Sequence, residues 1–403
     1  MLRLLIISHL FPNDVERSKG IFVFDQVKVI SKFHKIEVIS PIIWLPFYTF
    51  YDQLRHLNKI EHKCLFHNLK VNYPRYLAVP LRIKSKTLMW IAGILYLIAI
   101  GFEVLKIKSK FKFNIIHSHF AFPDGFASVI LGKILKKPVI ITVHGSDINL
   151  YTTEMNHLKP MVIYALKHAA HIITVSSDLK NKVIELGIDD NEISVVPNGY
   201  SSDLFKPMDQ VEVRKELGID LNKKVLLFVG NLVYIKGVTY LIEAMALLSK
   251  SRNDIILIIV GKGCLEVQIK QMIEKYNLFN SVSLVGSQPH EKMPLWMNAC
   301  DLLVLPSISE GFGAVIVEAN ACGKPIVATN VGGIPEICSQ ITSKLVPPKD
   351  PNALVKSILE VLDLSFDSIN IIKENKKFEY NKIADELNKI YYKTINDCDS
   401  HDQ

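Results

Sequence analysis

Short apolar runs alternate with amphipathic segments along nearly the whole 403-residue chain. The apolar runs have the length and composition of buried parallel strands, and the segments between them have helical periodicity. The pattern predicts strands over residues 2–8, 35–40, 114–118, 138–143, 171–175, 193–196, 225–229, 255–260, 282–285, 302–305 and 325–328. Such an alternation predicts an α/β fold in which helices cover both faces of parallel sheets.

The helical periodicity and one interruption of it define the expected domains. Helices are predicted over residues 21–33, 125–135, 159–169, 178–186, 238–250, 265–276, 314–321 and 378–395. The strands are too many for one ordinary sheet. Prolines, an Asn-Gly pair and two serines break the rhythm between residues 195 and 207, which indicates a linker. We therefore expect two doubly wound, Rossmann-like domains that face each other across a cleft, residues 1–200 and 201–375.

Composition and cysteine spacing narrow the class of protein. With 49% hydrophobic and 22% charged residues, the chain can bury two cores and is not disordered. The six cysteines lack CxxC spacing, which argues against a zinc ribbon or a disulfide framework and favours a reducing, cytosolic setting. The N-terminal segment MLRLLIISHLFP has too short an apolar run for a signal peptide, and we expect it to be the first strand.

Positive charge is concentrated in one stretch of the first half. Residues 51–112 contain 12 basic and 3 acidic residues, and within them residues 88–105 form an apolar run. Three interpretations stay open: a membrane span, a buried helix, or a helix at the membrane surface whose lysines bind anionic lipid headgroups. A span would cut the first domain in two, and nucleic acid is not expected as a partner because no binding motif is present. The flanking basic residues are Arg82, Lys84, Lys86, Lys106, Lys108, Lys110 and Lys112.

Two glutamates, Glu310 and Glu318, flank a turn between a predicted strand and a predicted helix. Because Gly311 and Gly313 lack side chains, a ligand can reach the backbone there, and the unpaired amides of the helix start suit a phosphate. A carboxylate repels a phosphate, so the two acids make better sense as acceptors for hydroxyl donors. A nucleotide sugar offers both groups, whereas the alternative is that both glutamates are simply solvated.

Loops after other predicted strands carry further candidate residues. Ligands of doubly wound sheets bind outside the carboxyl ends of the strands. Lys236 stands near the amino end of a helix, where it would offer positive charge to a phosphate, or it is a solvated surface lysine. The candidates at these strand ends are Gly20, His119, His144, Gly230, Asn231 and Lys236.

Fingerprints of several other site types are missing from the sequence. GxGxxG, the Walker-type GxxxxGK[ST] and HExxH do not occur, so the chain lacks the usual signals for dinucleotide binding, P-loop chemistry and zinc proteolysis. We expect only one of His117 and His119 to face a given side at the end of their strand, which leaves a metal site there as the weaker alternative.

Taken together, the motifs resemble the retaining glycosyltransferases of the GT-B fold, specifically the group 1 family that uses nucleotide sugars, including cell-wall and capsular polysaccharide transferases. The resemblance runs in order through RSKGIF, HSHFAFPDG, HGSDIN, VVPNG, VGNLVYIKG, SEGFGAVIVEANACGKPIVAT and VGGIPE, which together span nearly the whole chain. In this fold, a terminal helix at residues 376–403 crosses back to the first domain.

The resemblance also implies roles for individual residues. It implies that Glu318 binds the ribose hydroxyls of the donor and that Lys236 binds its diphosphate. Gly20 would offer its amide to a phosphate, and His119 would lie beside the sugar, with His144 as a less certain neighbour. The transferred sugar would be held by Glu310 together with Gly311, Phe312 and Gly313, and Gly230 and Asn231 would also take part in binding the donor.

The implied activity is transfer of a sugar, with retention, from a nucleotide-diphosphate donor to a saccharide or lipid-linked acceptor. Uridine is the usual base in the family, the acceptor would meet the first domain, and neither a metal nor another cofactor is expected. Asn231 stands where many members have an arginine, which would remove a contact of about 1.5–3 kcal/mol to the diphosphate. Asn231 makes a non-catalytic subunit that binds nucleotide sugar an alternative, and a nucleotide-sugar epimerase is a second one because it could use a similar two-domain cleft. The enzyme is expected in the cytoplasm, peripheral to the inner face of the membrane.

Overall fold

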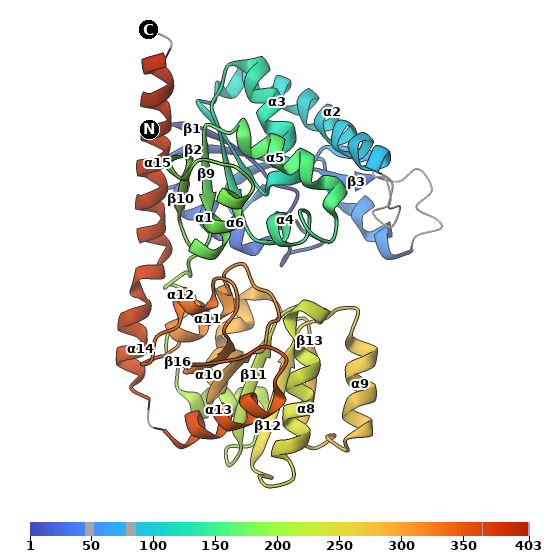
Figure 1. Ribbon diagram of the computed structural model, residues 1–403, viewed down its shortest axis with the longest axis vertical. Coiled ribbons are helices and arrows are strands. Elements are labelled where there is room, and N and C mark those ends of the chain that lie inside the picture. Colours follow the sequence, from blue (N-terminus) through green and yellow to red (C-terminus); the bar gives the residue numbers. More distant parts are fainter. Residues whose placement is uncertain (45–51, 78–85, 365, 402–403) are drawn as a thin grey trace. The chain divides into compact units, whose positions relative to one another are not determined.

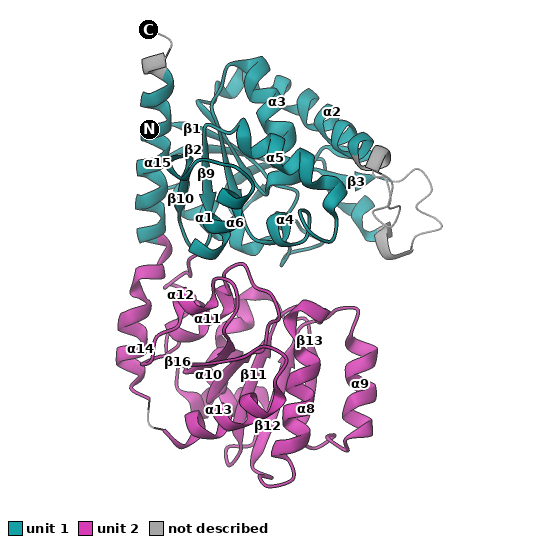
Figure 2. Cartoon of the chain, in the orientation of Figure 1, with its two compact units in different colours: residues 1–197, 381–403 teal, residues 198–380 magenta. Residues whose placement is uncertain are grey.

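The chain forms two compact units (Figure 2). The computed structural model describes residues 1–44, 52–77, 86–364 and 366–401. Unit 1 consists of Met1–Pro197 with Asn381–Gln403, and unit 2 of Asn198–Tyr380. Each unit is an α/β body with its own sheet, as the alternation of strands and helices predicts.

Unit 1 is built on an eight-stranded sheet (Figure 1). Neighbouring strands are parallel except for β4, which is antiparallel to β5. In spatial order the strands are β10 (Ile193–Val195), β9 (His171–Thr174), β8 (Val139–Val143), β7 (Ile115–His119), β1 (Arg3–Ile7), β2 (Lys35–Ile39), β5 (Leu69–Asn72) and β4 (Lys63–Phe66). Six of them confirm predicted strands, and their side chains are mostly buried because helices cover the sheet.

The sequence pattern missed four strands in unit 1. These are β4 and β5 at the sheet edge, and the separate parallel pair β3 (Ile42–Trp44) and β6 (Arg75–Leu77). All four have three or four residues, and each has at least one exposed position. Strands that short and that polar lack the continuous apolar run on which the prediction depended.

Most helices of unit 1 overlap predicted helical segments, although the four-residue helix at Ser146–Asn149 was not predicted. They are α1 (Ile21–Ile30), α2 (Lys86–Phe111), α3 (Phe126–Leu135), α4 (Ser146–Asn149), α5 (Lys159–Lys167), α6 (Ser177–Glu185) and α15 (Tyr380–His401). Helix α6 begins one residue before its predicted start, because the Ser176 hydroxyl accepts a hydrogen bond from the Leu179 amide and so forms a side-chain N-cap.

Helix α15 is attached to unit 1 by buried polar contacts. The Tyr391 hydroxyl is hydrogen-bonded to His117 Nδ1 at 2.8 Å, and Asn388 Oδ1 lies 2.7 Å from His34 Nε2. Tyr391 and His117 are fully buried, so each depends on the other for a hydrogen-bond partner at these atoms.

Helix α2 has two different faces. Its Gly93, Tyr96, Ile100 and Val104 are buried, and the helix packs against α3 and β6. The opposite face is exposed and also apolar. By length and composition Trp90–Phe111 is able to cross a membrane, with a mean hydropathy of 1.9, and a third of that apolar stretch is buried inside unit 1.

Unit 2 holds a six-stranded, fully parallel sheet. The spatial order is β13 (Val282–Gly286), β12 (Ile255–Val260), β11 (Lys224–Val229), β14 (Leu302–Leu305), β15 (Ile326–Thr329) and β16 (Ser343–Val346). Its helices are α7 (Gln210–Leu217), α8 (Val238–Leu248), α9 (Glu266–Lys275), α10 (Met293–Ala299), α11 (Ala314–Ala321), α12 (Ile334–Ile337), α13 (Pro351–Asp363) and α14 (Ser368–Asn375). Of the strands, only the short edge strand β16 was not predicted.

Each sheet reverses its strand order at one point. In unit 1 the chain runs outward from β1 through β2 and then returns to β7 on the other side of β1. In unit 2 it runs outward from β11 and returns to β14. Loops diverge at the carboxyl ends of such neighbouring strands, and open α/β sheets bind their ligands in that crevice.

We expect Tyr391→Phe to destabilise unit 1. Loss of the hydroxyl leaves the buried His117 Nδ1 without its partner, which costs about 1–3 kcal/mol. Urea unfolding, with the unit 1 transition followed by hydrogen exchange of β7 peptides, measures this change. Tyr392→Phe is the matched control, because Tyr392 is 45% exposed. Equal stability of the two variants would contradict the role given to Tyr391.

Candidate active site

In unit 2 the loops after β11 and β14 are fixed to each other by their backbones. The Ile308 amide donates to the Ile235 carbonyl at 2.7 Å. Gly237 has a φ of +63°, and a Cβ there would lie 1.9 Å from the carbonyl oxygen of Pro306. Only glycine permits this approach, which holds the preceding residue, Lys236, against the β14 loop.

The side chains of Lys236 and Glu310 form an ion pair at this strand-order reversal. Lys236 Nζ lies 2.5 Å from Glu310 Oε2, and the Ser307 hydroxyl donates to the same oxygen at 3.2 Å. Both hydrogen bonds that the structure gives this carboxylate use Oε2, so Oε1 is able to accept from another donor. The side chains are 23% and 13% exposed, which keeps the pair accessible to a ligand.

Helix α11 begins directly after this pair, with bounds that confirm the predicted segment 314–321. Gly313 is its N-cap with a φ of 93°, and no side chain caps this described end of the helix. Phe312 is buried with its ring 5.8 Å from that of Phe378, which anchors the loop. Glu318 is half-buried one turn into the helix. The arrangement therefore places backbone amides and carboxylates in one short segment.

Gly230 and Asn231 lie where the β11 loop starts. The Gly230 amide donates to the Val260 carbonyl at 3.0 Å, so the chain is still tied to the sheet at this point. Asn231 is exposed. The structure thus places both predicted residues in the same loop as Lys236.

Unit 1 has its own group of candidate residues at the β1–β7 reversal. Gly20 is the N-cap of α1 with a φ of 64°, and a Cβ there would lie 2.3 Å from the Leu10 carbonyl oxygen. Glycine is therefore required where the chain turns back from β1 into α1. His119 is the last residue of β7, so both predicted residues lie after the two strands at which the order reverses.

Three histidines with little access to water gather at the end of β7. His119 Nδ1 lies 3.0 Å from His144 Nε2, and the rings of His117 and His119 stack with centroids 4.6 Å apart. The expectation that only one of His117 and His119 faces a given side was therefore wrong, because side chains two residues apart on a strand share a face. His119 Nε2 and His144 Nδ1 are buried and have no hydrogen-bond partner in the part of the chain that is described.

Burial keeps these histidines neutral. Desolvation lowers the pKa of His117 and of His144 to about 3, and for His144 the neighbouring His117 and His9 add to the effect. The pKa of His119 also lies well below its ordinary value, because of desolvation and then the charges of His117 and His144. A neutral imidazole with an unused nitrogen is suited to hydrogen-bond a polar ligand without carrying charge.

Sequence reasoning missed three acids and hydroxyls that position the predicted residues. Asp147 is buried and accepts hydrogen bonds from the amides of Ala121, His144 and Gly145, and burial raises its pKa. Asp124 is buried between His9 and the Tyr96 hydroxyl. The Ser307 hydroxyl holds the Glu310 carboxylate. The HGSD and FAFPDG strings contained both aspartates, but a one-dimensional pattern does not reveal which amides they accept from.

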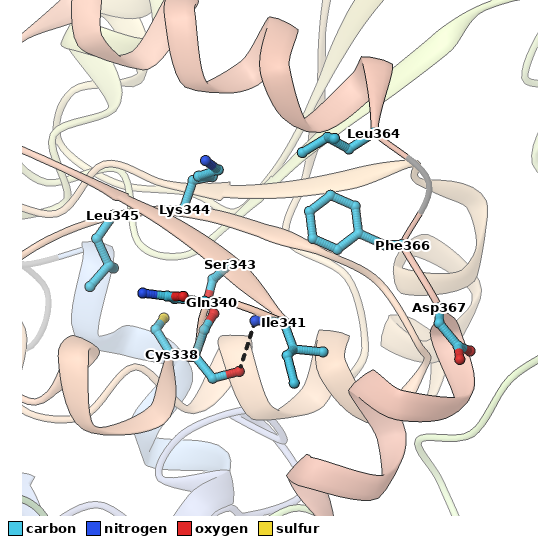
Figure 3. A pocket seen from close by; sticks show the side chains of 10 residues that line it. Cys338, Gln340, Ile341, Ser343, Lys344, Leu345, Leu364, Phe366 and Asp367 are labelled. Atoms are coloured by element: carbon cyan, nitrogen blue, oxygen red, sulfur yellow. Dashed lines mark hydrogen bonds between the residues drawn. The ribbon is translucent and has the colours of Figure 1, made fainter.

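A pocket of about 790 Å³ lies elsewhere on unit 2, at the edge strand β16 (Figure 3). Leu364 and Phe366 line one side of it, and Cys338 and Gln340 line another. Its residue Ser343 begins β16, at the amino end of the strand. Because Lys236 and Glu310 follow the carboxyl ends of parallel strands, this pocket is not part of the candidate site.

Lowering the pH should destabilise unit 1. The pKa values of the three histidines are lowered below 6.5 in the folded chain. As the pH falls below 6.5, these histidines therefore bind protons in the unfolded chain but not in the folded chain. We expect the unfolding free energy to fall by about 1.4 kcal/mol per pH unit for each histidine between about pH 6 and pH 4. Asp147, whose pKa is raised, opposes this loss only in part.

Urea titrations across this pH range measure the slope. His144→Gln should make the slope shallower by the share of one histidine. His62→Gln is the control, because His62 is exposed, and should leave the slope unchanged. A stability that does not vary between pH 6 and pH 4 would show that the three histidines are not desolvated in the folded chain.

The chain matches known protein families over both units. Residues 209–383 match the family described as "Glycosyl transferases group 1", and residues 48–204 match "Glycosyltransferase Family 4". The putative teichuronic acid biosynthesis glycosyltransferase TuaC of Bacillus subtilis is 28% identical over 89% of this chain and 88% of its own length. The uncharacterized glycosyltransferase MJ1178 of Methanocaldococcus jannaschii is 33% identical over 74% of this chain and 81% of its own length.

Solved structures show the same architecture. Sucrose-phosphate synthase from Thermosynechococcus elongatus superposes with a TM-score of 0.77 at 20% identity, covering 98% of this chain and 99% of that one. Anabaena HepE in complex with UDP and glucose gives a TM-score of 0.75 at 21% identity, covering 97% and 100%. The chain therefore belongs to the glycosyltransferases and has the GT-B fold, and its unit 2 matches the group 1 model.

Proposed function

We propose that this enzyme moves a sugar from a UDP-sugar donor to a saccharide or lipid-linked acceptor, with retention, in surface polysaccharide biosynthesis. The observation that carries the proposal is the Lys236–Glu310 pair beside the start of α11. It combines a cation, the amides of a helix start and carboxylate acceptors, which are the groups that a sugar diphosphate needs. HepE was solved in complex with UDP and glucose, and TuaC is named for teichuronic acid biosynthesis, both of which support this class of substrate.

The chemical step develops negative charge on the leaving diphosphate. The bond from the anomeric carbon to the phosphate oxygen breaks, and the acceptor oxygen bonds to that carbon from the same face. The acceptor proton passes to the departing phosphate oxygen. Lys236 and the amides of Gly311 to Ala314 stabilise the charge, which is the main catalytic effect that these groups can supply.

The ion pair suggests how the donor is received. Lys236 is paired with Glu310 at 2.5 Å. An arriving diphosphate competes for the ammonium group, while Glu310 keeps the Ser307 hydroxyl and has Oε1 for a sugar hydroxyl. Glu318, one turn along α11, is assigned to the ribose hydroxyls. Glu310 is not assigned as a covalent nucleophile, because a sugar-hydroxyl acceptor role accounts for its position.

Lysine and helix amides provide the positive charge in this scheme, so we propose that no metal is required. The roles of Gly20 and His119 in contacting phosphate and sugar are part of the same proposal. His119 fits a neutral role, since its depressed pKa keeps it uncharged and its Nε2 has no partner among the described residues. Gly230 and Asn231 begin the loop that carries Lys236, and Asn231 adds no charge to it.

We further propose that the enzyme is cytoplasmic and binds the inner face of the membrane through α2. The exposed apolar stripe of α2 consists of Ile91, Ile94, Ile98, Phe102 and Leu105, which are 41–65% exposed. Lys106, Lys108, Lys110 and Lys112 follow at its end and suit anionic headgroups. Arg82 and Lys84, part of the predicted membrane-contacting segment, lie outside the described residues.

Lys236→Gln should reduce sugar transfer by about 100-fold or more, because it removes a cation that stabilises the leaving diphosphate. The measurement is nucleotide release from a panel of nucleotide sugars with extracted lipid-linked acceptors. Lys250→Gln is the matched control, since Lys250 is exposed just past the other end of α8.

Three results would contradict the proposal. Donor binding without acceptor-dependent nucleotide release, in the wild type and in Glu310→Ala alike, would indicate a non-catalytic binding subunit. A changed sugar after incubation of donor alone would indicate an epimerase. Equal activity of the Lys236→Gln and Lys250→Gln variants would remove Lys236 from the mechanism.

Phe102→Ser should weaken binding to anionic vesicles about tenfold, because a buried aromatic side chain contributes roughly 1.5–3 kcal/mol. Vesicle sedimentation measures it. Phe279→Ser is the matched control, because Phe279 is 64% exposed and Phe102 is 65% exposed. Equal recovery of the wild type in the supernatant with neutral and with anionic vesicles would count against the membrane contact.

A further inference from the structure

A second pocket, which no part of the proposed sugar chemistry uses, lies on unit 1 where α2 ends over the sheet edge. It has a volume of about 700 Å³ and is lined by residues of β2, β4, β5 and the last turns of α2. Four lysines line it: Lys63 from β4, Lys70 from β5, and Lys106 and Lys110 from α2. We call this site the lysine pocket.

The lysine pocket has an excess of positive charge. Glu103 is buried and binds both Lys63 and Lys106 at 3.2 Å, which fixes these two ammonium groups at the pocket. Glu37 also lines the site, and burial raises its pKa. Four lysines against these two acids leave a formal charge of +2. Neither Lys70 nor Lys110 takes part in an ion pair within the described part of the chain.

Structural contacts explain part of the cluster. The helix dipole stabilises cations at the end of a helix, which applies to Lys106 and Lys110, and Glu103 pairs with Lys63. Lys70 stands opposite Glu37 in the register of β2 and β5, but the described residues give it no ion pair. Four lysines from three elements line this one cavity and exceed the two acids by two charges, which fits a ligand with several anionic oxygens.

The pocket continues the exposed apolar stripe of α2. Phe102 is 65% exposed and precedes Lys106 by four residues, so the two side chains follow each other on one face of the helix. Leu65, which lines the pocket from β4, is 66% exposed. Exposed apolar side chains, which can enter the acyl region of a bilayer, are therefore followed along the helix by lysines. A phospholipid has the matching order of groups, with acyl chains followed by a phosphate.

We infer that the lysine pocket binds the headgroup phosphate of an anionic phospholipid in the membrane that α2 contacts. This inference deepens the proposed membrane attachment and rests on it, but it does not depend on the sugar chemistry. The phosphate oxygens occupy the pocket between Lys70 and Lys110, and the acyl chains extend along the Phe102 side. The pocket would thereby set the orientation in which unit 1 rests on the bilayer.

The test compares two double variants of the full chain that lose the same charge. Lys70→Gln/Lys110→Gln removes lysines that line the pocket, and Lys108→Gln/Lys112→Gln removes exposed lysines of the same region that do not line it. The general attraction of a lysine to an anionic surface is lost equally in both. We expect binding to phosphatidylglycerol vesicles to weaken about fivefold more in the pocket variant. Equal weakening would overturn the inference.

A second experiment, with a soluble ligand, tests whether the bound phosphate belongs to a lipid or to a soluble molecule. The probe is glycerol phosphate without vesicles, which should bind only at millimolar concentration because it lacks the bilayer contacts. Micromolar binding that the pocket variant abolishes would assign the pocket to a soluble phosphorylated ligand and overturn the lipid assignment. Nucleotide release with a soluble acceptor should be unchanged in both double variants. If the wild type shows no nucleotide release, the glycosyltransferase proposal is refuted, whereas the result of the vesicle experiment still stands.

Discussion

The Lys236–Glu310 ion pair depends on strand order more than on either residue alone. The two side chains are 74 residues apart in sequence, and they meet at 2.5 Å because β11 and β14 are neighbours in the sheet. A partly buried pair is costly to desolvate unless its geometry and hydrogen bonds compensate, and here Ser307 contributes a further bond to the carboxylate. The fold thus holds both charged groups at one point of the sheet edge, where the proposed diphosphate would compete with Glu310 for the Lys236 ammonium.

The candidate residues of unit 1 are buried polar groups that are neutral rather than charged. The three histidines at the end of β7 are desolvated, and their depressed pKa values show that burial outweighs any gain from charge. His117 has both nitrogens paired, with Tyr391 and Thr142, whereas His119 and His144 each have a buried nitrogen with no partner among the described residues. An unpaired buried nitrogen costs free energy, and this cost is recovered only if a polar ligand supplies the missing partner. His117, with both nitrogens paired, is therefore a structural histidine, whereas His119 and His144 are candidates for ligand binding.

Sequence pattern predicted most of the strands and many of the helices, but it missed α13, which has 13 residues and an Asp350 N-cap. The helix over 314–321 has the expected bounds because Gly313 and Gly323 delimit a run of small residues. The strands β3 to β6 and β16 were not predicted, because each has only three or four residues, some of them polar, and no hydrophobic period can be recognised over that length. The candidate site was only partly predictable. The sequence did not show whether Lys236 binds a ligand or is a solvated surface residue, because its partner Glu310 is brought close only by the order of strands in the sheet. Nothing in the sequence indicated that Asp124 and Asp147 accept hydrogen bonds from backbone amides. The stacking of His117 on His119 was mispredicted through a wrong use of strand periodicity.

Helix α2 shows why an apolar run of membrane-spanning length does not by itself indicate a span. Its inner face carries polar groups that other elements of the folded unit 1 satisfy: the Tyr96 hydroxyl binds the buried Asp124, and Glu103 binds Lys63 of β4. Placing this helix across a bilayer would break these bonds and leave a carboxylate in hydrocarbon, a cost of several kcal/mol by most estimates. Packing against unit 1 satisfies the inner face but leaves the outer stripe in water. The membrane contact that we propose would satisfy both faces, because the helix would keep its polar contacts with unit 1 while its exposed apolar side chains left water.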